Sequence, residues 1–330
     1  MMNGLNHTGM RPLHFAGLAA ILVLGVLTSF PAMAQRSTTL LVGFAAGTAP
    51  DSLARILAEG IERTGGPGLI VENVAGAGGQ IAAARLSKAP ADGSVLMLGE
   101  LGIAAIAPYA FTNLPYDSFK DFSFVSEAAR THFAFIAPRK DGFPSMQAFI
   151  DKAKTQPTTL LATFGVTSPG HIAAELLGQA YGFKIEPVHY RGVGDAISDL
   201  GNGRVAGAFV SVPLASAQAK GGQLAALVQT GETRSPLLAD APTSKEAGTP
   251  ALSMSSWFVV MAPAGLKAET SEQLNKAVAT ALRDAGTRDR LINAGFEPVG
   301  TSVIETGQMV ERERARWKSV IEKAGIKVGN

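Results

Sequence analysis

The chain has 330 residues, of which 46% are hydrophobic and 17% are charged, so it can form a sizeable core and its length predicts two domains. Lys and Arg total 29 and Asp and Glu total 27, which leaves a net charge of +2 and no basic run of the kind found in nucleic-acid-binding proteins. The chain has no cysteine, which excludes disulfides, zinc–thiolate sites, thiol nucleophiles and a lipidated N-terminal cysteine.

The N-terminus has the pattern of a secretory signal peptide. Basic residues without acids precede the apolar run Phe15–Leu27, which is too short to span a bilayer. Ala32 and Ala34 then provide the small-x-small pattern that a signal peptidase needs. The sequence predicts a leader over residues 1–34, cleavage after Ala34 and a soluble periplasmic protein that begins at Gln35. An N-terminal membrane anchor is the alternative.

The mature chain alternates short apolar runs with amphipathic segments, which predicts an α/β fold with a largely parallel sheet. The first predicted elements are strand Thr39–Phe44, helix Asp51–Arg63, strand Gly68–Asn73, helix Gln80–Ser87 and strand Ser94–Gly99. After about residue 130 the pattern starts again, with strand Phe133–Ala137, helix Met146–Thr155, strand Leu160–Phe164, helix His171–Tyr181, strand Ile185–Tyr190, helix Gly194–Leu200 and strands Val205–Val210 and Gln223–Gln229. The last predicted elements are strand Phe258–Ala262 and helices Ser271–Asp284 and Ser302–Ala324. No low-complexity linker separates the halves, which favours a chain that crosses between two lobes and returns.

Three glycine-containing loops, over residues 43–51, 164–171 and 190–195, each leave a predicted strand and open a predicted helix. Ligands of open α/β sheets bind beyond the carboxyl ends of the strands. Helix N-termini offer unpaired N–H groups and partial positive charge, and glycine lets the backbone approach a ligand closely. The three loops therefore predict an anion site.

Several side chains in these loops have two interpretations. Ser168 before Pro169 is a helix N-cap or a ligand contact, and Thr167 is the better candidate for a ligand hydroxyl. Asp51 and Asp195 either favour the helix dipole or contact an amine or hydroxyl of the ligand, and Asp51 could instead orient its loop.

Two aromatic or basic residues beside the loops are equally open. Phe44 could line the pocket or belong to the core, and Arg191 could pair with a carboxylate or lie in solvent.

Catalytic and cofactor motifs are weak. Ile81 stands where a dinucleotide loop after Gly76–Gly79 needs Gly or Ala. His171 and Glu175 share a helix face as a possible metal pair, but no third ligand accompanies them. The sequence has no G-x-S-x-G, H-E-x-x-H or P-loop motif. We therefore predict no catalytic residue, no metal and no cofactor.

An ordered series of short motifs covers the mature chain. It consists of Val42–Gly47 with Asp51 and Arg55, Val71–Asn73 with Gly76–Gly79, Asp92-Gly93, Leu114–Asp117, Asp121-Phe122, His171 with Glu175, Tyr190 with Gly192, Asp199-Leu200, Gly203, Arg234, Pro242-Thr243, Glu246–Gly248 and Ser256-Trp257. In this series the chain resembles the Bug receptors, the extracytoplasmic binding proteins of tripartite tricarboxylate transporters.

The resemblance implies a two-lobed Venus flytrap of the periplasmic-binding-protein type II class. Lobe 1 would comprise residues 35–132 and 254–330, and lobe 2 residues 133–253. Such a receptor is a monomer that binds a small carboxylate through loop amides, hydroxyls and ordered waters, and it meets the membrane transporter subunits transiently. The ligand-binding residues that the family pattern and the loops indicate are Phe44, Ala46, Gly47, Thr48, Asp51, Thr167, Ser168, His171, Tyr190, Gly192 and Asp195.

The sequence departs from the family pattern at the first loop. Ala45-Ala46-Gly47-Thr48 lacks the usual proline and second glycine, so the loop geometry is altered and Thr48 adds a hydroxyl. Val74-Ala75, His189 and Arg191 also replace the usual residues. Two other functions fit the pattern: a ligand sensor for a membrane signalling protein, and a secreted α/β hydrolase whose nucleophile and base meet only in space.

Overall fold

The structure is a computed structural model, and it describes residues 38–164, 168–190 and 192–327. The first elements are β1 (Thr38–Val42), α1 (Ala49–Arg63), β2 (Leu69–Asn73), the short turn η1 (Ala77–Gly79), α2 (Gln80–Leu86), β3 (Val95–Glu100), the π-helical segment η2 (Gly102–Ile106), α3 (Ala107–Ala110) and β4 (Phe122–Pro138). Then come α4 (Met146–Lys154), β5 (Thr159–Thr163), α5 (Pro169–Tyr181), β6 (Ile185–His189), α6 (Val193–Asn202), β7 (Gly207–Ser211), α7 (Val212–Lys220) and β8 (Leu224–Gln229). The last elements are β9 (Ser255–Pro263), α8 (Ala268–Arg283), α9 (Ala285–Asn293), β10 (Glu297–Pro298) and α10 (Val303–Ala324).

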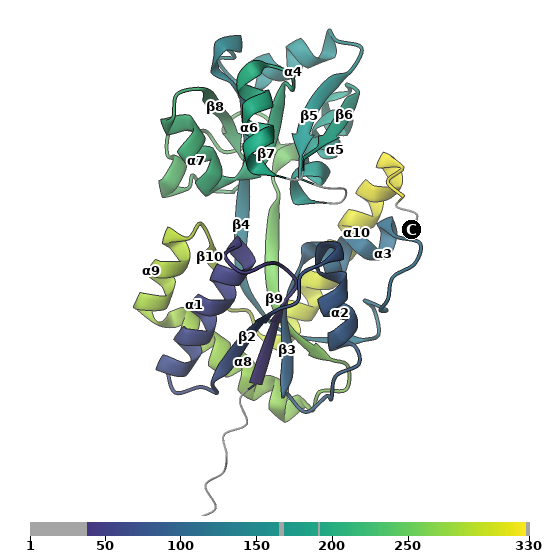
Figure 1. Cartoon of the computed structure of the whole chain (residues 1–330), viewed down its shortest axis with the longest axis vertical. Coiled ribbons are helices and arrows are strands. Elements are labelled where there is room, and N and C mark those ends of the chain that lie inside the picture. Colours follow the sequence, from purple (N-terminus) through teal and green to yellow (C-terminus); the bar gives the residue numbers. More distant parts are fainter. Residues whose placement is uncertain (1–37, 165–167, 191, 328–330) are drawn as a thin grey trace, which may run out of the picture. The chain divides into compact units, whose positions relative to one another are not determined.

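The long strand β4 belongs to two groups of strands (Figure 1). Its first part pairs with β9 and β10 in the order β2-β1-β3-β9-β4. Its second part pairs with β7 and β8, and β7 continues to β5 and β6. The change of partner falls between His132, which lies opposite Ser255, and Phe133, which lies opposite Ser211. β4 therefore links the two groups covalently.

The strand directions place the carboxyl ends of both groups on the same junction. β9 is antiparallel to β4 and to β3, so β1, β2 and β3 run in the same direction as β4, toward the second group. β7 is antiparallel to β4, and β5 and β6 are parallel to β7, so these three strands run back toward the first group. The loops that follow β1, β2, β3, β5 and β6 are thus directed at the point where β4 changes partners.

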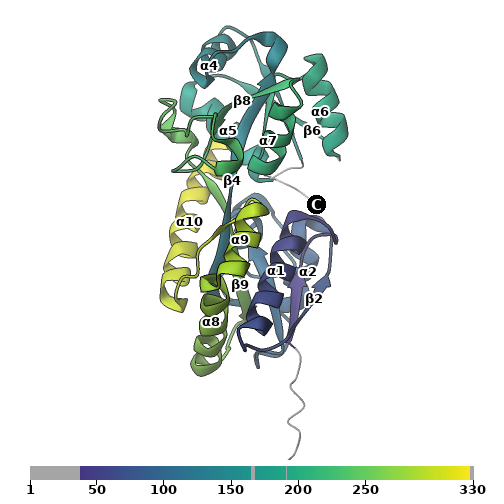
Figure 2. The ribbon, with the colours of Figure 1, turned by 90° about the vertical axis from the view of Figure 1, so that its left-hand side faces the viewer.

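Helices cover both faces of each group (Figure 2). On one face of the first group, α1, α8 and α9 bury apolar side chains such as Leu57 and Val278 against β1 and β3. On the other face, α2, η2 and α10 pack against the same sheet through residues such as Leu86 and Trp317. In the second group, α4 and α5 cover one face and α6 and α7 the other.

The predicted α/β class is confirmed, but the sheet is mixed rather than largely parallel. β4 begins eleven residues before the predicted strand Phe133–Ala137, because polar side chains such as Glu127 and Arg130 interrupt the apolar run. Helices α7 and α9 were not predicted, since α7 is built of small residues and α9 is mostly polar. Within the described ranges, no helix combines the length and apolar character needed to cross a membrane.

Three segments of the first group meet through glycine. A Cβ placed on Gly43, just after β1, would lie 2.6 Å from the Cα of Gly79. A Cβ on Gly79 would lie 2.7 Å from the Cδ1 of Ile103. Gly79 has φ +89°, a conformation that a side chain would strain. The ends of β1, β2 and β3 are therefore packed into one continuous surface.

Replacing Gly43 by alanine should lower the free energy of unfolding by about 2 kcal/mol, because the neighbouring atom belongs to the backbone and cannot rotate away. Gly68→Ala is the matched control, since no atom lies within 4 Å of its added Cβ. Urea unfolding of the two variants measures the difference. Equal midpoints for Gly43→Ala, Gly68→Ala and the unmodified chain would show that the loops can separate without cost.

Candidate functional site

Asp51 is buried in the first turn of α1 and holds the first loop together. Its Oδ2 accepts hydrogen bonds from the Gly47 N–H at 2.9 Å and from the Arg55 Nε at 3.1 Å. Its Oδ1 accepts a hydrogen bond from the Asn73 Nδ2 at 2.9 Å and lies 3.0 Å from an Arg55 Nη2. The same Asn73 amide donates to the carbonyl of Phe44 at 3.0 Å. Both carboxylate oxygens are thus occupied by the chain itself.

These donors stabilise the ionised form of Asp51. The hydrogen bond from Arg55 is the largest cause, and together with Gly47 and Asn73 it lowers the pKa of Asp51 to about 2, against the opposing effect of burial. The structure therefore supports the interpretation in which Asp51 orients its loop. A direct contact between Asp51 and a ligand stays a prediction.

The rest of the first loop presents backbone and one hydroxyl. Thr48 is the N-cap of α1, but its Oγ1 donates to the carbonyl of Ala45 at 2.6 Å instead of capping the helix. Ala46 and Gly47 are exposed, and Gly47 has φ +80°. Phe44 is half-buried and packs against the core of the first group. The loop thus offers exposed backbone directly before the N-terminus of α1.

The second loop ends in a capped helix. The Ser168 Oγ accepts a hydrogen bond from the His171 N–H at 3.3 Å, so the capping interpretation of Ser168 is confirmed. Thr167 lies outside the described residues. His171 is buried, and its Nε2 lies 3.6 Å from the Glu175 Oε1.

His189, in the second group of strands, packs against His171. The ring of His189, at the end of β6, meets that of His171 edge to face at 5.1 Å. The His189 Nδ1 lies 2.6 Å from the Thr163 Oγ1. Burial, and secondarily the charge of His171, lowers the pKa of His189. Among the described residues, no three His, Asp or Glu side chains are grouped to hold a metal ion.

The third loop is anchored by Tyr190. Its hydroxyl donates to the Asp199 Oδ2 at 2.8 Å, and Asp199 also pairs with Arg204 at 2.9 Å. Burial, together with Asp199, raises the pKa of Tyr190 to about 12. Gly192 is the N-cap of α6, and Asp195 is exposed in its first turn. Arg191 lies outside the described residues.

The predicted ligand residues that the structure describes therefore stand at or just before the N-termini of three helices, α1, α5 and α6. All three helices follow strands whose carboxyl ends face the junction. Their first-turn N–H groups carry partial positive charge toward that region. This arrangement suits a small anion.

Sequence reasoning did not single out two side chains that shape this site. Asn73, at the end of β2, bonds both Asp51 and the first loop. Glu100 is the last residue of β3, which pairs with β1 just before the first loop. Their position at the carboxyl ends of predicted strands is the signal that could have found them.

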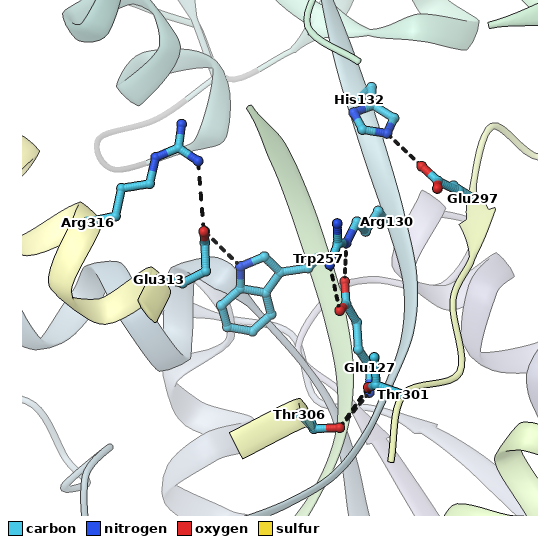
Figure 3. Close-up of polar contacts among 9 residues, drawn as sticks. All are labelled: Glu127, Arg130, His132, Trp257, Glu297, Thr301, Thr306, Glu313 and Arg316. Atoms are coloured by element: carbon cyan, nitrogen blue, oxygen red, sulfur yellow. Dashed lines mark hydrogen bonds and ion pairs between the residues drawn. The ribbon is translucent and has the colours of Figure 1, made fainter. Parts of the chain in front are cut away.

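A cavity of about 650 Å³ lies on the β4–β10 edge of the junction. It is lined by residues of β4, α9 and α10 and of the segments around Thr230 and Ser255, and none of the predicted ligand residues lines it. The polar network beside this cavity is shown in Figure 3. Glu127, fully buried on β4, pairs with Arg130 and bonds through its N–H to the Thr301 Oγ1 at 3.0 Å. This network fixes β4 just before it changes partners.

The comparisons with known proteins decide the family. A model described as the tripartite tricarboxylate transporter family receptor matches residues 53–326. The chain belongs to this family. The Bordetella pertussis protein BugT is 29% identical over 295 residues, covering 89% of this chain and 90% of BugT. The predicted resemblance to the Bug receptors is thereby confirmed.

Solved structures of similar proteins confirm the fold. The structure of R. palustris Rpa4515 with adipate has a TM-score of 0.78 and 32% identity, and covers 88% of this chain and 98% of that one. MatC from Rhodopseudomonas palustris with bound malate has a TM-score of 0.73 and 28% identity, and covers 86% and 98%. The chain is a two-lobed solute-binding receptor of a tripartite tricarboxylate-type transporter.

Replacing Asp51 by asparagine should lower the free energy of unfolding by about 2 kcal/mol at neutral pH, because the charge-assisted bonds to Arg55 and Asn73 weaken. The folded-state pKa is depressed, so this contribution is fully present above the unfolded value of 3.8 and is lost as the pH falls toward about 2. Urea unfolding at neutral and at acidic pH measures both effects.

Asp240→Asn is the matched control, because Asp240 is exposed and has no hydrogen bond to the described part of the chain. Its stability should stay within about 0.5 kcal/mol of the unmodified chain. A loss in Asp51→Asn that persists unchanged at acidic pH would contradict the ionised bridge.

Proposed function

We propose that this receptor captures a small carboxylate between the loops that end β1, β5 and β6. The observation that carries the proposal is the convergence of the N-termini of α1, α5 and α6 on one junction. Adipate and malate, the molecules named with Rpa4515 and MatC, are both small dicarboxylates. The family membership favours transport over sensing and over hydrolysis, so we propose a receptor without catalytic activity.

Within this site the residues have different roles. The backbone of Ala46 and Gly192 donates N–H groups to the carboxylate, whereas the Gly47 N–H is bound to Asp51 and Gly47 acts through the shape of its loop. The hydroxyls of Thr167 and Ser168 add further donors, Thr48 holds the loop through its bond to the Ala45 carbonyl, and Phe44 and His171 bound the space. Asp51 and Tyr190 act through the loops that they hold, and Asp195 lies at the rim.

The two lobes are proposed to comprise residues 35–132 with 254–330, and residues 133–253. The change of partner in β4 after His132 and the start of β9 at Ser255 support these boundaries. The lobes close on the ligand as hinged bodies. The receptor acts as a monomer that meets the membrane subunits of the transporter transiently.

The location follows from the leader. We propose export to the periplasm, with cleavage after Ala34. Expression of the full chain in a Gram-negative host should yield a periplasmic protein. Its mass, measured on the intact protein, should be that of a chain that begins at Gln35. A membrane-bound product that retains residues 1–34 would instead identify an anchor.

Small carboxylates should raise the melting temperature of the mature chain by several degrees at saturating concentration, because a ligand that binds only the folded state stabilises it by mass action. Adipate and malate are the first probes. The controls are a diol and a diamine with the same number of carbon atoms as adipate. A smaller radius of gyration in X-ray scattering should accompany binding. The proposal would be overturned if only the diamine raised the melting temperature. It would also be overturned if no carboxylate of a broad panel raised it.

Gly192→Ala tests the site itself. Gly192 has φ −133°, and the only described neighbour of its added Cβ is the Asp195 Oδ2 at 3.9 Å, so the fold tolerates a side chain there. Affinity for the bound carboxylate should fall about tenfold, because a Cβ hinders close approach to the amide. Gly201→Ala, in the last turn of the same helix, should leave the affinity unchanged.

A further inference from the structure

Glu100 ends β3 beside the first candidate loop, since Leu98, two residues before it, pairs with Val42 at the end of β1. It is the last residue of β3, the strand between β1 and β9. Ile103, three residues on, contacts Gly79, and Gly79 contacts Gly43 of the first loop. Glu100 is half-buried, and its Oε1 lies 2.9 Å from the position that a Cβ on Gly102 would take. A carboxyl group thus stands at the carboxyl end of β3, next to a loop that is proposed to bind carboxylates.

The carboxyl group of Glu100 makes no hydrogen bond or ion pair with the residues that the structure describes. Asp51, at the same edge of the sheet, is held ionised by Gly47, Arg55 and Asn73. Glu100 has no such donors, and burial raises its pKa to about 7. The two acids therefore differ in charge near neutral pH because of their partners.

The neighbours of Glu100 do not offset the effect of burial on its pKa. Phe258 lies opposite it on β9, and the Tyr116 hydroxyl is a neutral group that donates to the Ile103 carbonyl at 3.2 Å. Burial, and secondarily the charge of Glu100, raises the pKa of Tyr116 further above its usual value. On α10, which packs against η2, Arg314 donates to the carbonyls of Ala104 and Ser118.

Other charged side chains of α10 and α1 are also bound to other residues. Glu311 pairs with Arg314, and Glu313 bonds the Trp257 Nε1 at 3.1 Å. On α1, Arg55 is bound to Asp51. These contacts leave Glu100 to respond chiefly to its desolvation and to the ligand.

We propose that Glu100 binds the ligand as a neutral acid whose carboxyl O–H donates a hydrogen bond to a carboxylate oxygen, so that capture of the anion by the ionised form takes up one proton from solvent. This inference rests on the proposed function. A neutral carboxyl is a hydrogen-bond donor, whereas an ionised one would repel the ligand. The η2 segment that follows Glu100 is π-helical, a local geometry frequent at functional sites.

The competing ligand chemistry is an ammonium group paired with ionised Glu100. Such a site needs donors that keep the carboxylate charged before the ligand arrives, as Arg55 does for Asp51. The described surroundings of Glu100 supply none, and the nearby start of α1 favours an anion. The two chemistries predict opposite dependence of affinity on pH.

The test is calorimetric titration of the mature chain with adipate and with malate between about pH 6 and about pH 8. The affinity should fall about tenfold over this range, since only the protonated form of Glu100 binds. Titration at about pH 8 in buffers of different ionisation enthalpy should show about one proton taken up per ligand bound.

Glu100→Gln keeps a neutral donor of the same shape, so its affinity should match that of the unmodified chain at low pH and vary less than twofold with pH. Glu62→Gln, at an exposed position near the end of α1, is the matched control and should keep the full pH dependence. Its melting temperature and that of Glu100→Gln confirm that both variants fold.

The outcomes separate the two proposals. Binding that is independent of pH, that strengthens as the pH rises, or that keeps its slope in Glu100→Gln overturns the role of Glu100 and leaves the carboxylate receptor standing. A slope that persists in Glu100→Gln assigns the titration to another group, such as His189. Failure of both ligands and of the wider carboxylate panel at every pH overturns the proposed function itself.

Discussion

The direction of β4 is the constraint on which the rest of the structure depends. Because β4 runs from one group of strands into the other, every strand paired with it inherits a direction relative to the junction. The parallel strands of the first group run toward the junction, and those of the second group run back to it. Loops that lie more than a hundred residues apart in the sequence are thereby directed at the same region. Only two strand connections, β4 and the return at β9, are needed to achieve this, and they are natural places for a hinge.

The polar side chains of these loops mostly serve the protein rather than the ligand. Asp51 is bound by Arg55 and Asn73, and Tyr190 is bound by Asp199. Ser168 caps α5. What remains available is backbone N–H at helix starts, which recognises a carboxylate group without depending on the rest of the molecule that carries it. A loop fixed in advance by buried bonds also loses little conformational freedom on binding. This division of labour would let the proposed site select anions although few of its described charged side chains are free.

The sequence was sufficient to predict the fold class and the family, because apolar periodicity and an ordered set of short motifs survive without any knowledge of contacts. The three loops were predicted for the same reason, since each combines a strand end, a glycine and a helix start. The first part of β4 was missed because it carries Glu127 and Arg130, whose charges cancel only through their pairing in the folded chain. The bond between Asn73 and Asp51 joins residues 22 positions apart and leaves no local pattern. The assignment of ligand contacts stays a prediction, as do the lobe boundaries.

Glu100 shows why such a site is difficult to read from sequence. A single glutamate at the end of a strand has the pattern of a solvated residue, and nothing in its neighbours' identities distinguishes it from Asp51. The difference arises in three dimensions, where Asp51 meets a guanidinium and an amide while Glu100 meets none among the described residues. An acid that loses water and gains no donor is stabilised as the neutral form, and a neutral acid is complementary to an incoming anion. The same desolvation that makes Glu100 costly to ionise in the empty receptor would thus become a favourable contact once a carboxylate is bound. Such a group would couple occupancy of the site to the pH of the surrounding solution without requiring any further element of structure.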